Sequence, residues 1–178
     1  MFNTNIIPAV KSVKGFENFI KTDYEYCVLM NMHLSILKRL VEKGHAANKK
    51  CLLHLDLING LSSDEYGAEY AIQSLKVDGL VSTKNSVMKI AKKKKVLAIY
   101  RVFLIDNHSL GKSIDRVNDL RPDYVEILPA LAYKAITKIK EKVTIPIIGG
   151  GLITCKEDIE DCIKAGMVAV TTSDSNLW

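Results

Sequence analysis

Apolar residues occur along the chain in short runs, and these runs alternate with segments in which apolar residues stand three or four positions apart. A continuous run of about four to eight apolar residues is typical of a buried strand, whereas the wider spacing is typical of one face of a helix. The apolar runs lie at Ile6–Val10, Tyr26–Met30, Cys51–Leu57, Gly79–Ser82, Leu97–Phe103, Tyr124–Leu128, Ile145–Ile148 and Val168–Thr171. The sequence therefore predicts eight strands with helices between them, such as the helix that carries Leu34, Leu37 and Leu40.

The alternation of strands and helices indicates that the strands are parallel. Eight strand–helix units favour an α/β fold, a closed (β/α)8 barrel of the TIM type. Such barrels typically need about 250 residues, whereas this chain has 178, so we expect short connections and a truncated last helix after Ser173. No linker interrupts the pattern, so residues 1–178 are expected to form a single domain. An open doubly wound sheet is the alternative that the pattern leaves.

Composition limits the class of protein. With 48% hydrophobic residues, the chain can bury a core. No apolar run is long enough to span a membrane, and the start of the chain lacks the segments of a signal peptide, so we expect a cytoplasmic protein. The cysteines, Cys27, Cys51, Cys155 and Cys162, form no C-x-x-C pair, which favours buried free thiols over a metal site. We expect neither a metal nor a cofactor. The net charge of +5 permits an anionic partner without requiring one.

The ends of the last two predicted strands carry glycines and hydroxyls. Gly150 and Gly151 follow one apolar run, and Thr172 and Ser173 follow the next. In a β/α barrel the loops after strands seven and eight frequently bind a phosphate. Glycines allow backbone N–H groups to approach the phosphate, and hydroxyls add further donors. The sequence therefore predicts a phosphate site at these four residues and a small phosphorylated ligand.

Ionisable side chains stand at or near the ends of the middle strands. They are His54, Asp56, Lys84, Arg101 and Glu126. His54 and Asp56 are expected to share one face of the third strand because strand side chains alternate. Buried charges need a partner or a ligand, so we expect a ligand-binding ring at the barrel mouth. The alternatives are a structural salt-bridge layer, an acid/base pair of Asp56 and Glu126 in an enzyme, or a metal-dependent hydrolase that also uses Asp106.

Six phrases of the sequence lie, in order, at His54–Leu61, Asp78–Lys84, Arg101–Asp106, Pro122–Pro129, Gly150–Ile153 and Thr172–Trp178. Together they resemble the glycerol-3-phosphate-responsive antiterminator family of bacteria, and the resemblance runs from about residue 6 to the end of the chain. The resemblance implies a barrel that binds glycerol 3-phosphate as an effector and acts on leader mRNA of glycerol-use operons, preventing premature termination. Three positions depart from the usual pattern: Tyr100 replaces a glutamine, Ala130 a glycine and Thr171 a serine.

The residues themselves support an RNA partner only through a run of lysines, Lys92, Lys93, Lys94 and Lys95. This run falls at a predicted helix end, where cations also complement the helix dipole, so a solvated helix end explains it equally well. The leading hypothesis is a non-catalytic metabolite sensor that contacts RNA. The alternative is a TIM-barrel isomerase, aldolase or phosphodiesterase with a small phosphorylated substrate. Association into a homo-oligomer is left open.

Overall fold

The computed structural model is a closed barrel of parallel strands, and it describes residues 2–178, except for the side chains of residues 107–109 and 133–134. Each strand pairs with the next in the sequence, and β8 pairs with β1. The strands are β1 (Ile6–Val10), β2 (Tyr26–Leu29), β3 (Lys50–His54), β4 (Gly79–Ser82), β5 (Leu97–Phe103), β6 (Tyr124–Leu128), β7 (Ile147–Gly150) and β8 (Ala169–Thr172). The closed order excludes the open doubly wound sheet and confirms the predicted (β/α)8 barrel.

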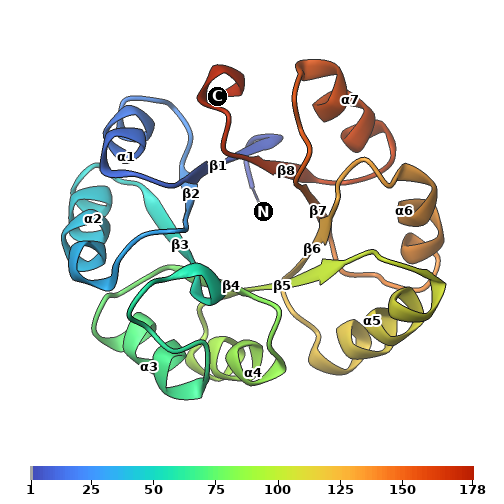
Figure 1. Cartoon of the computed structure of the whole chain (residues 1–178), viewed down its shortest axis with the longest axis horizontal. Helices are drawn as coiled ribbons and strands as arrows, with labels where there is room; N and C mark the ends of the chain where they lie inside the picture. Colours follow the sequence, from blue (N-terminus) through green and yellow to red (C-terminus); the bar gives the residue numbers. More distant parts are fainter. Residues whose placement is uncertain (1) are drawn as a thin grey trace.

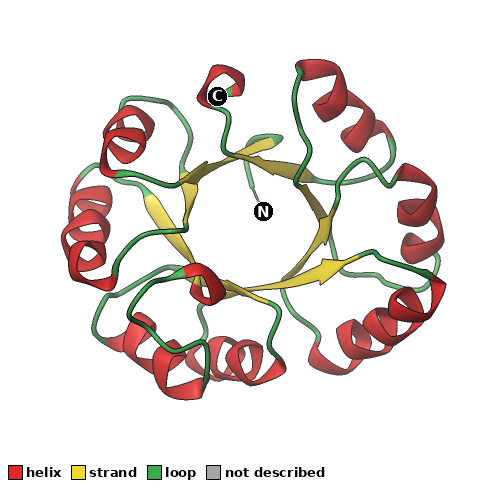
Figure 2. Cartoon of the chain, viewed as in Figure 1, coloured by secondary structure: helices red, strands yellow, loops and turns green. Residues whose placement is uncertain are grey.

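Helices follow the strands and form an outer ring around the barrel (Figures 1 and 2). They are α1 (Val13–Ile20), α2 (Leu34–Ala46), α3 (Glu65–Gln73), α4 (Asn85–Lys94), α5 (Asn107–Leu120), α6 (Tyr133–Lys140) and α7 (Lys156–Lys164). The 3-10 turn η1 (Leu55–Leu57) follows β3, and after β8 the chain makes only the 3-10 turn η2 (Ser175–Leu177). The last helix is thus truncated, as expected. Within residues 2–178, no helix is both long and apolar enough to cross a membrane.

The interior of the barrel is filled by an apolar floor to which every strand contributes one buried side chain. The floor residues are Ile7, Val28, Leu52, Val81, Ile99, Tyr124, Ile148 and Ala169. Phe2 closes the floor from below, where its ring centroid lies 4.9 Å from that of Tyr26 and 4.6 Å from that of Tyr124. Because the floor is dry and packed, a ligand can enter the barrel only from the opposite end of the strands.

The second interior layer is set by the two-residue period of a strand, which turns the residue two positions after each floor residue to the same side. These residues are Ala9, Met30, His54, Thr83, Arg101, Glu126, Gly150 and Thr171. Most of them are polar, whereas the floor is almost wholly apolar. The sequence therefore builds a polar layer on an apolar one at the carboxyl ends of the strands, where β/α barrels bind their ligands.

Four strands differ from the prediction at their ends, and in two of them, β3 and β7, the difference exceeds one residue. The third strand ends at His54 instead of Leu57, because the chain leaves the sheet in the turn η1. Asp56 lies in that turn, so its expected position on one strand face with His54 is wrong. The seventh strand runs to Gly150 instead of ending at Ile148. Its predicted start was too early, because Pro146 has no N–H group to donate to a neighbouring strand.

Candidate functional site

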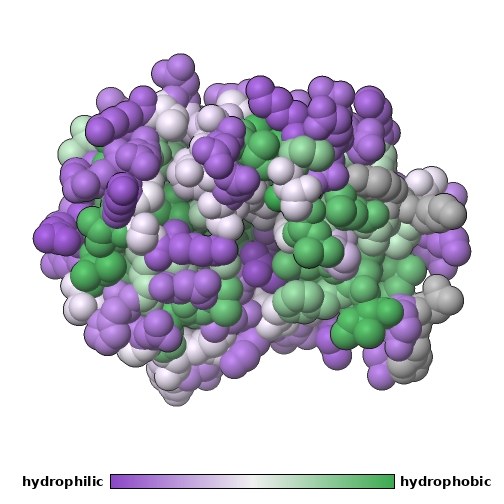
Figure 3. Space-filling model, turned by 45° about the horizontal axis from the view of Figure 1, so that its top comes forward, coloured by the Kyte–Doolittle hydropathy of each residue, from purple (hydrophilic) through white to green (hydrophobic). Residues whose placement is uncertain are grey.

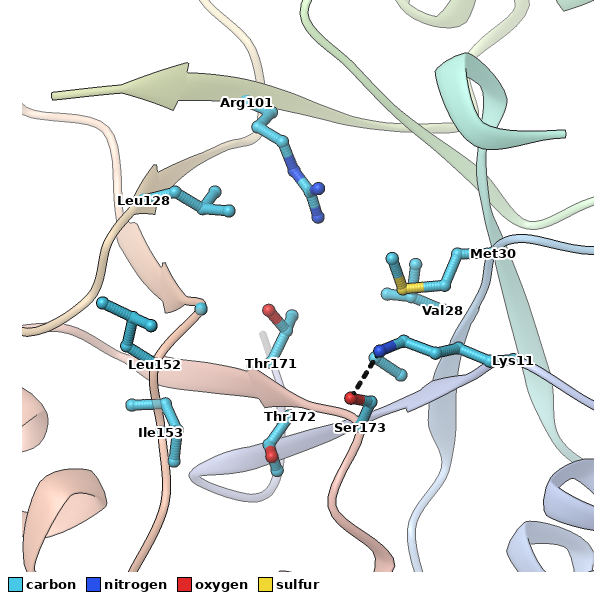
Figure 4. Close-up of a pocket in the computed structure, with 12 residues that line it drawn as sticks. Lys11, Val28, Met30, Arg101, Leu128, Leu152, Ile153, Thr171, Thr172 and Ser173 are labelled. Atoms are coloured by element: carbon cyan, nitrogen blue, oxygen red, sulfur yellow. Dashed lines mark hydrogen bonds between the residues drawn. The ribbon is translucent and has the colours of Figure 1, made fainter. Parts of the chain in front are cut away.

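A cavity of about 160 Å³ opens at the carboxyl ends of the strands. Since a water molecule takes about 30 Å³ of liquid volume, this cavity has room for a small molecule. Its wall comes from strands β1, β2, β5, β6 and β8 and from the loop after β7 (Figure 4). The lining residues are Ala9, Lys11, Val28, Met30, Arg101, Leu128, Gly151, Leu152, Ile153, Thr171, Thr172 and Ser173.

Lys11 enters the site directly after β1, and sequence reasoning missed it. Its Nζ donates to Ser173 Oγ at 2.8 Å. The two residues are 162 positions apart in the chain, but β1 and β8 are neighbours in the closed barrel. The signal was available in the sequence: once eight strands are expected to close, a cation after the first strand must lie beside the end of the last one. Lys11 therefore adds a positive charge to the predicted phosphate corner.

Arg101 and Glu126 form a buried ion pair at the bottom of the cavity. Arg101 Nε donates to Glu126 Oε2 at 2.7 Å, and Thr171 Oγ1 donates to the other carboxylate oxygen at 2.6 Å. The Glu126 side chain is 1% exposed and that of Arg101 is 9% exposed. Figure 4 shows the end of the Arg101 guanidinium directed into the cavity, facing Lys11 from the other side. The pair thus holds Arg101 in place and presents its remaining N–H groups to a ligand.

The loop after β7 brings its backbone close to the same corner. Gly150 is closely packed, because a Cβ atom there would lie 2.8 Å from Thr171 Oγ1 and 2.9 Å from Glu126 Oε1. Gly151 and Leu152 then adopt left-handed conformations, with φ values of +74° and +60°. Glycine accepts such a φ readily. Gly151, Thr172 and Ser173 line the cavity, whereas Gly150 supports it from behind.

His54 lies in the polar layer, outside the lining of the cavity, and is 2% exposed. Neither of its ring nitrogens has a hydrogen-bond partner among residues 2–178. Burial, assisted by the positive charge of Arg101, lowers the pKa of the imidazole to about 4, although the carboxylates of Glu126 and Asp56 oppose that shift. At neutral pH the ring is therefore uncharged, with one donor and one acceptor available.

Asp56 is held by hydroxyl groups. Its Oδ1 accepts from Ser63 Oγ at 2.6 Å and from Ser82 Oγ at 2.5 Å, and its Oδ2 accepts from the backbone N and the Oγ1 of Thr83 at 2.7 and 2.9 Å. Desolvation alone would raise the pKa of this carboxyl, but the hydrogen bonds outweigh it and lower the pKa. Asp56 thus ties the turn after β3 to the end of β4.

The expected ring of four charged side chains is therefore only partly present. Arg101 and Glu126 meet, whereas Asp56 binds the hydroxyl groups of its own corner. Lys84 is the residue directly before α4, and its backbone N donates to Ser82 Oγ at 3.0 Å. The Lys84 side chain is exposed and does not line the cavity. The salt-bridge layer among all four residues is not formed. The sequence could not show this, because the charge pattern does not reveal which acids are bound by nearby hydroxyls.

The C-terminal tail packs beside the same strand end. Trp178 Nε1 donates to the carbonyl oxygen of Thr172 at 3.0 Å, and the backbone N of Asp174 donates to Thr172 Oγ1 at 3.2 Å. Leu177 and Trp178 are partly buried against the core. The tail therefore fixes the backbone at Thr172, one of the residues predicted to contact the phosphate.

The three departures from the usual family pattern occupy different places. Thr171 lies in the cavity and hydrogen-bonds Glu126. Ala130 is fully buried, and its N–H donates to the carbonyl of Gly150 at 2.8 Å. Tyr100 faces away from the barrel interior into the outer core, so it does not form part of the cavity wall. Only Thr171 therefore contacts the space that a ligand would fill.

The four lysines predicted to contact RNA lie at the end of α4, beside the start of β5. Lys92 pairs with Asp123 at 2.9 Å and Lys94 with Glu69 at 3.3 Å. Lys93 and Lys95 are exposed. Since helices of the barrel run opposite to the strands, this basic run is at the far end of the molecule from the cavity.

The chain is thus a (β/α)8 barrel with a small cavity at its mouth, which is lined by two cations, Lys11 and Arg101. The chain belongs to the family of glycerol-3-phosphate responsive antiterminators, whose family model matches residues 6–178. This confirms the resemblance inferred from the sequence.

The chain is also similar to individual proteins, two of them antiterminator proteins of known structure and one that shares the fold alone. A glycerol uptake operon antiterminator regulatory protein from Listeria monocytogenes is 38% identical, with a TM-score of 0.94 over 99% of this chain and 95% of that chain. An antiterminator-related protein from Thermotoga maritima is 26% identical, with a TM-score of 0.86 over 100% and 99% of the two chains. YgcP of Escherichia coli K12, an uncharacterised protein, is 30% identical over 97% of this chain and 91% of its own length. Deoxyribose phosphate aldolase from Aeropyrum pernix, 14% identical, shares the fold, with a TM-score of 0.72 over 95% and 85% of the chains.

Proposed function

We propose that this protein is a sensor of glycerol 3-phosphate which, when the effector is bound, binds leader mRNA of glycerol-use operons in the cytoplasm and prevents premature termination. The observation that carries the proposal is the mouth cavity, where two cations, hydroxyl groups and a glycine backbone surround a space suited to a small anion. Membership of the family supports the identity of the effector.

The phosphate is assigned to the corner formed by β7, β8 and β1. There the backbone of Gly151, the hydroxyls of Thr172 and Ser173, and Lys11 offer donors, and Gly150 allows the loop to approach closely. Charge-assisted hydrogen bonds to an oxyanion are about twice as strong as neutral ones. Lys11 is already directed to Ser173, so it needs little rearrangement to bind a phosphate.

The glycerol hydroxyls are assigned to the polar layer below. Arg101 offers donors, Glu126 an acceptor, and Thr171 both. His54 contributes a neutral ring with no competing partner among the described residues. Asp56 acts on the site indirectly, by fixing the end of β4, and we leave Lys84 out of the site because its side chain is exposed.

The RNA-binding surface is proposed to include Lys92, Lys93, Lys94 and Lys95. The effector can promote RNA binding only if it binds the RNA-competent state more tightly. The tail is suited to this coupling, because Trp178 holds the strand end that carries the phosphate-binding hydroxyls.

Two measurements test this function. Fluorescence anisotropy with leader transcripts of the host's glycerol-use genes should show tighter RNA binding when glycerol 3-phosphate is present. Incubation with glycerol 3-phosphate alone should return it unchanged, because the proposed role is regulatory. Consumption of the effector would instead establish the alternative, an enzyme that acts on a phosphorylated substrate, and RNA binding that ignores the effector would refute the sensor.

A further inference from the structure

A second depression lies at the mouth end of β5, beside α5 and next to Thr83, which directly precedes α4. Its volume is about 240 Å³. It is lined by Thr83, Tyr100, Arg101, Val102, Phe103, Lys112, Ser113 and Arg116. Arg101 lines both this depression and the effector cavity. Both spaces therefore adjoin β5.

Two of the charged side chains of α5 line the depression. Lys112 and Arg116 are one helical turn apart, and both line the depression. Asp115 and Asp119 are also one turn apart, but neither belongs to its lining. The lining that the structure describes thus contains cations and hydroxyls and no carboxylate, so the depression is suited to a negatively charged partner.

An aromatic ring completes this surface. The Phe103 side chain lines the depression and is 50% exposed, and Ile105 beside it is 82% exposed. Figure 3 shows hydrophobic side chains on the right of that view and smaller groups of them elsewhere on the same face, among hydrophilic side chains. A small anion needs no exposed ring, but single-stranded nucleic acid combines phosphates that pair with cations and bases that stack on aromatic side chains.

A third depression lies at the opposite end of β5, beside the C-terminal end of α4. That depression is lined by Lys92, Lys95, Val96, Leu97 and Asp123. Depressions lined by two cations from neighbouring helices or helix ends therefore lie at both ends of β5, and two of the four lysines proposed above, Lys92 and Lys95, line the one at its start, where Lys92 pairs with Asp123. A single partner that bridges both ends must be extended and polyanionic.

We propose that single-stranded RNA binds across the α4–α5 face, with phosphates on Lys112 and Arg116 and a base stacked on Phe103. This inference rests on the proposed function, and it locates the RNA contact that the effector influences. A ligand that holds Arg101 also holds β5, and Phe103, two residues further along β5, lines the depression that the RNA would occupy. Effector and RNA thereby share one structural element.

The test compares the double variant Lys112→Ala/Arg116→Ala with the matched control Lys38→Ala/Arg39→Ala. The control removes the same two charges from exposed positions on α2, across the barrel from α5 (Figure 1). Binding of a leader transcript is measured by fluorescence anisotropy at several salt concentrations with glycerol 3-phosphate present. The α5 variant should lose roughly tenfold or more in affinity and show a weaker salt dependence, since each lost phosphate contact lowers the slope by about 0.7. The control should stay within about twofold of the wild type.

Phe103→Ala provides the second readout. It should weaken RNA binding roughly tenfold with an unchanged salt slope, because stacking does not release counterions. Thermal stabilisation by glycerol 3-phosphate should be preserved in the α5 variant, which shows that the barrel and effector site are intact. If the α5 variant and the control lose affinity equally, or if Phe103→Ala has no effect, the surface is wrong and the proposed function stands. If the wild type binds no leader RNA, the RNA part of the proposed function fails and this surface with it.

Discussion

The two acidic side chains of the barrel mouth, Asp56 and Glu126, differ in what surrounds them. Asp56 accepts hydrogen bonds from its own corner, from hydroxyls and a backbone N–H of the β3 and β4 ends. Glu126 is bound by a cation and by a hydroxyl that both line the cavity. The first corner is closed on itself, whereas the second holds donors ready for a ligand. Substitutions in the first corner should therefore change stability, and those in the second should change ligand binding.

His54 is influenced by charges of both corners, and its titration should give the largest effect. The folded-state pKa of about 4 lies below the unfolded value of 6.5. Below pH 6.5 the unfolded chain takes up a proton that the folded protein resists, so the free energy of unfolding falls as the pH drops toward 4. For His54 alone the loss between pH 7 and 4 is about 3 kcal/mol. Urea unfolding across this range should show a shallower decline for His54→Gln, and parallel curves would contradict the assigned environment.

Gly150→Val should abolish effector binding. The new side chain would enter the space of Thr171 Oγ1 and Glu126 Oε1, which lie 2.8 and 2.9 Å from its Cβ. Glycerol 3-phosphate at 100 times its Kd should stabilise the wild type by about 2.7 kcal/mol, and the variant by nothing. Differential scanning fluorimetry measures the shift. Gly111→Val is the control, because a Cβ there meets no atom within 4 Å, and stabilisation of the Gly150 variant equal to that of the control would remove this corner from the site.

Lys11→Ala should weaken effector binding roughly tenfold, since a hydrogen bond to a charged group contributes about 1.5–3 kcal/mol. The residue donates to Ser173 and lines the cavity. Lys14→Ala, at an exposed position on α1, removes the same charge a turn away and should leave the affinity unchanged. Isothermal titration calorimetry compares the two variants. Equal losses would indicate a general field effect and not a contact with the phosphate.

Glu126→Gln should weaken effector binding by more than about 1 kcal/mol, the scale of a lost charge-assisted hydrogen bond. Gln fills the same volume and keeps an oxygen for Thr171, but it no longer balances the charge of Arg101. Calorimetric titration with glycerol 3-phosphate gives the affinity, and urea unfolding gives the stability. If neither changes, Glu126 lies outside the working site.

Asp56→Asn should have the smallest effect on binding, within about twofold, and its consequence should appear in acid. The lowered pKa means that this carboxylate stabilises the folded protein above its unfolded pKa of about 4, and that the contribution is lost as the pH falls through the lower folded value. The variant should therefore lose less stability than the wild type below pH 4. A strong loss of effector affinity would show that Asp56 contacts the ligand and would end the contrast between the two corners.

The sequence was sufficient to predict the barrel because the apolar runs, the helical spacing between them and the number of repeats all indicate the same fold. Apolar runs separated by helical spacing placed all eight strands, and the errors were confined to their ends, such as the turn after His54. There the hydrogen bonds of Asp56 compete with the sheet, and such competition depends on Ser82 and Thr83, which reach it only through the fold.

The candidate site was predictable in part. Arg101, Glu126 and Thr172 could be found because polar residues interrupt or end apolar strands. Lys11 was not predicted, because its position beside Ser173 follows only from the closure that joins β8 to β1 and not from the order of consecutive strands. Lys84 was included because a charge after a strand looks like a site residue, although the first turn of α4 exposes its side chain. The direction of a side chain at a strand–helix junction depends on the turn, which the pattern does not contain.

The indole that anchors the tail has an optical consequence. Trp178 is the only tryptophan in the chain, and its ring N–H is bound to the carbonyl of Thr172 at the edge of the cavity. All tryptophan emission of the protein therefore originates at one strand end, with no other indole to mask it. The molecule therefore carries its own spectroscopic probe of the strand end to which we assign the phosphate.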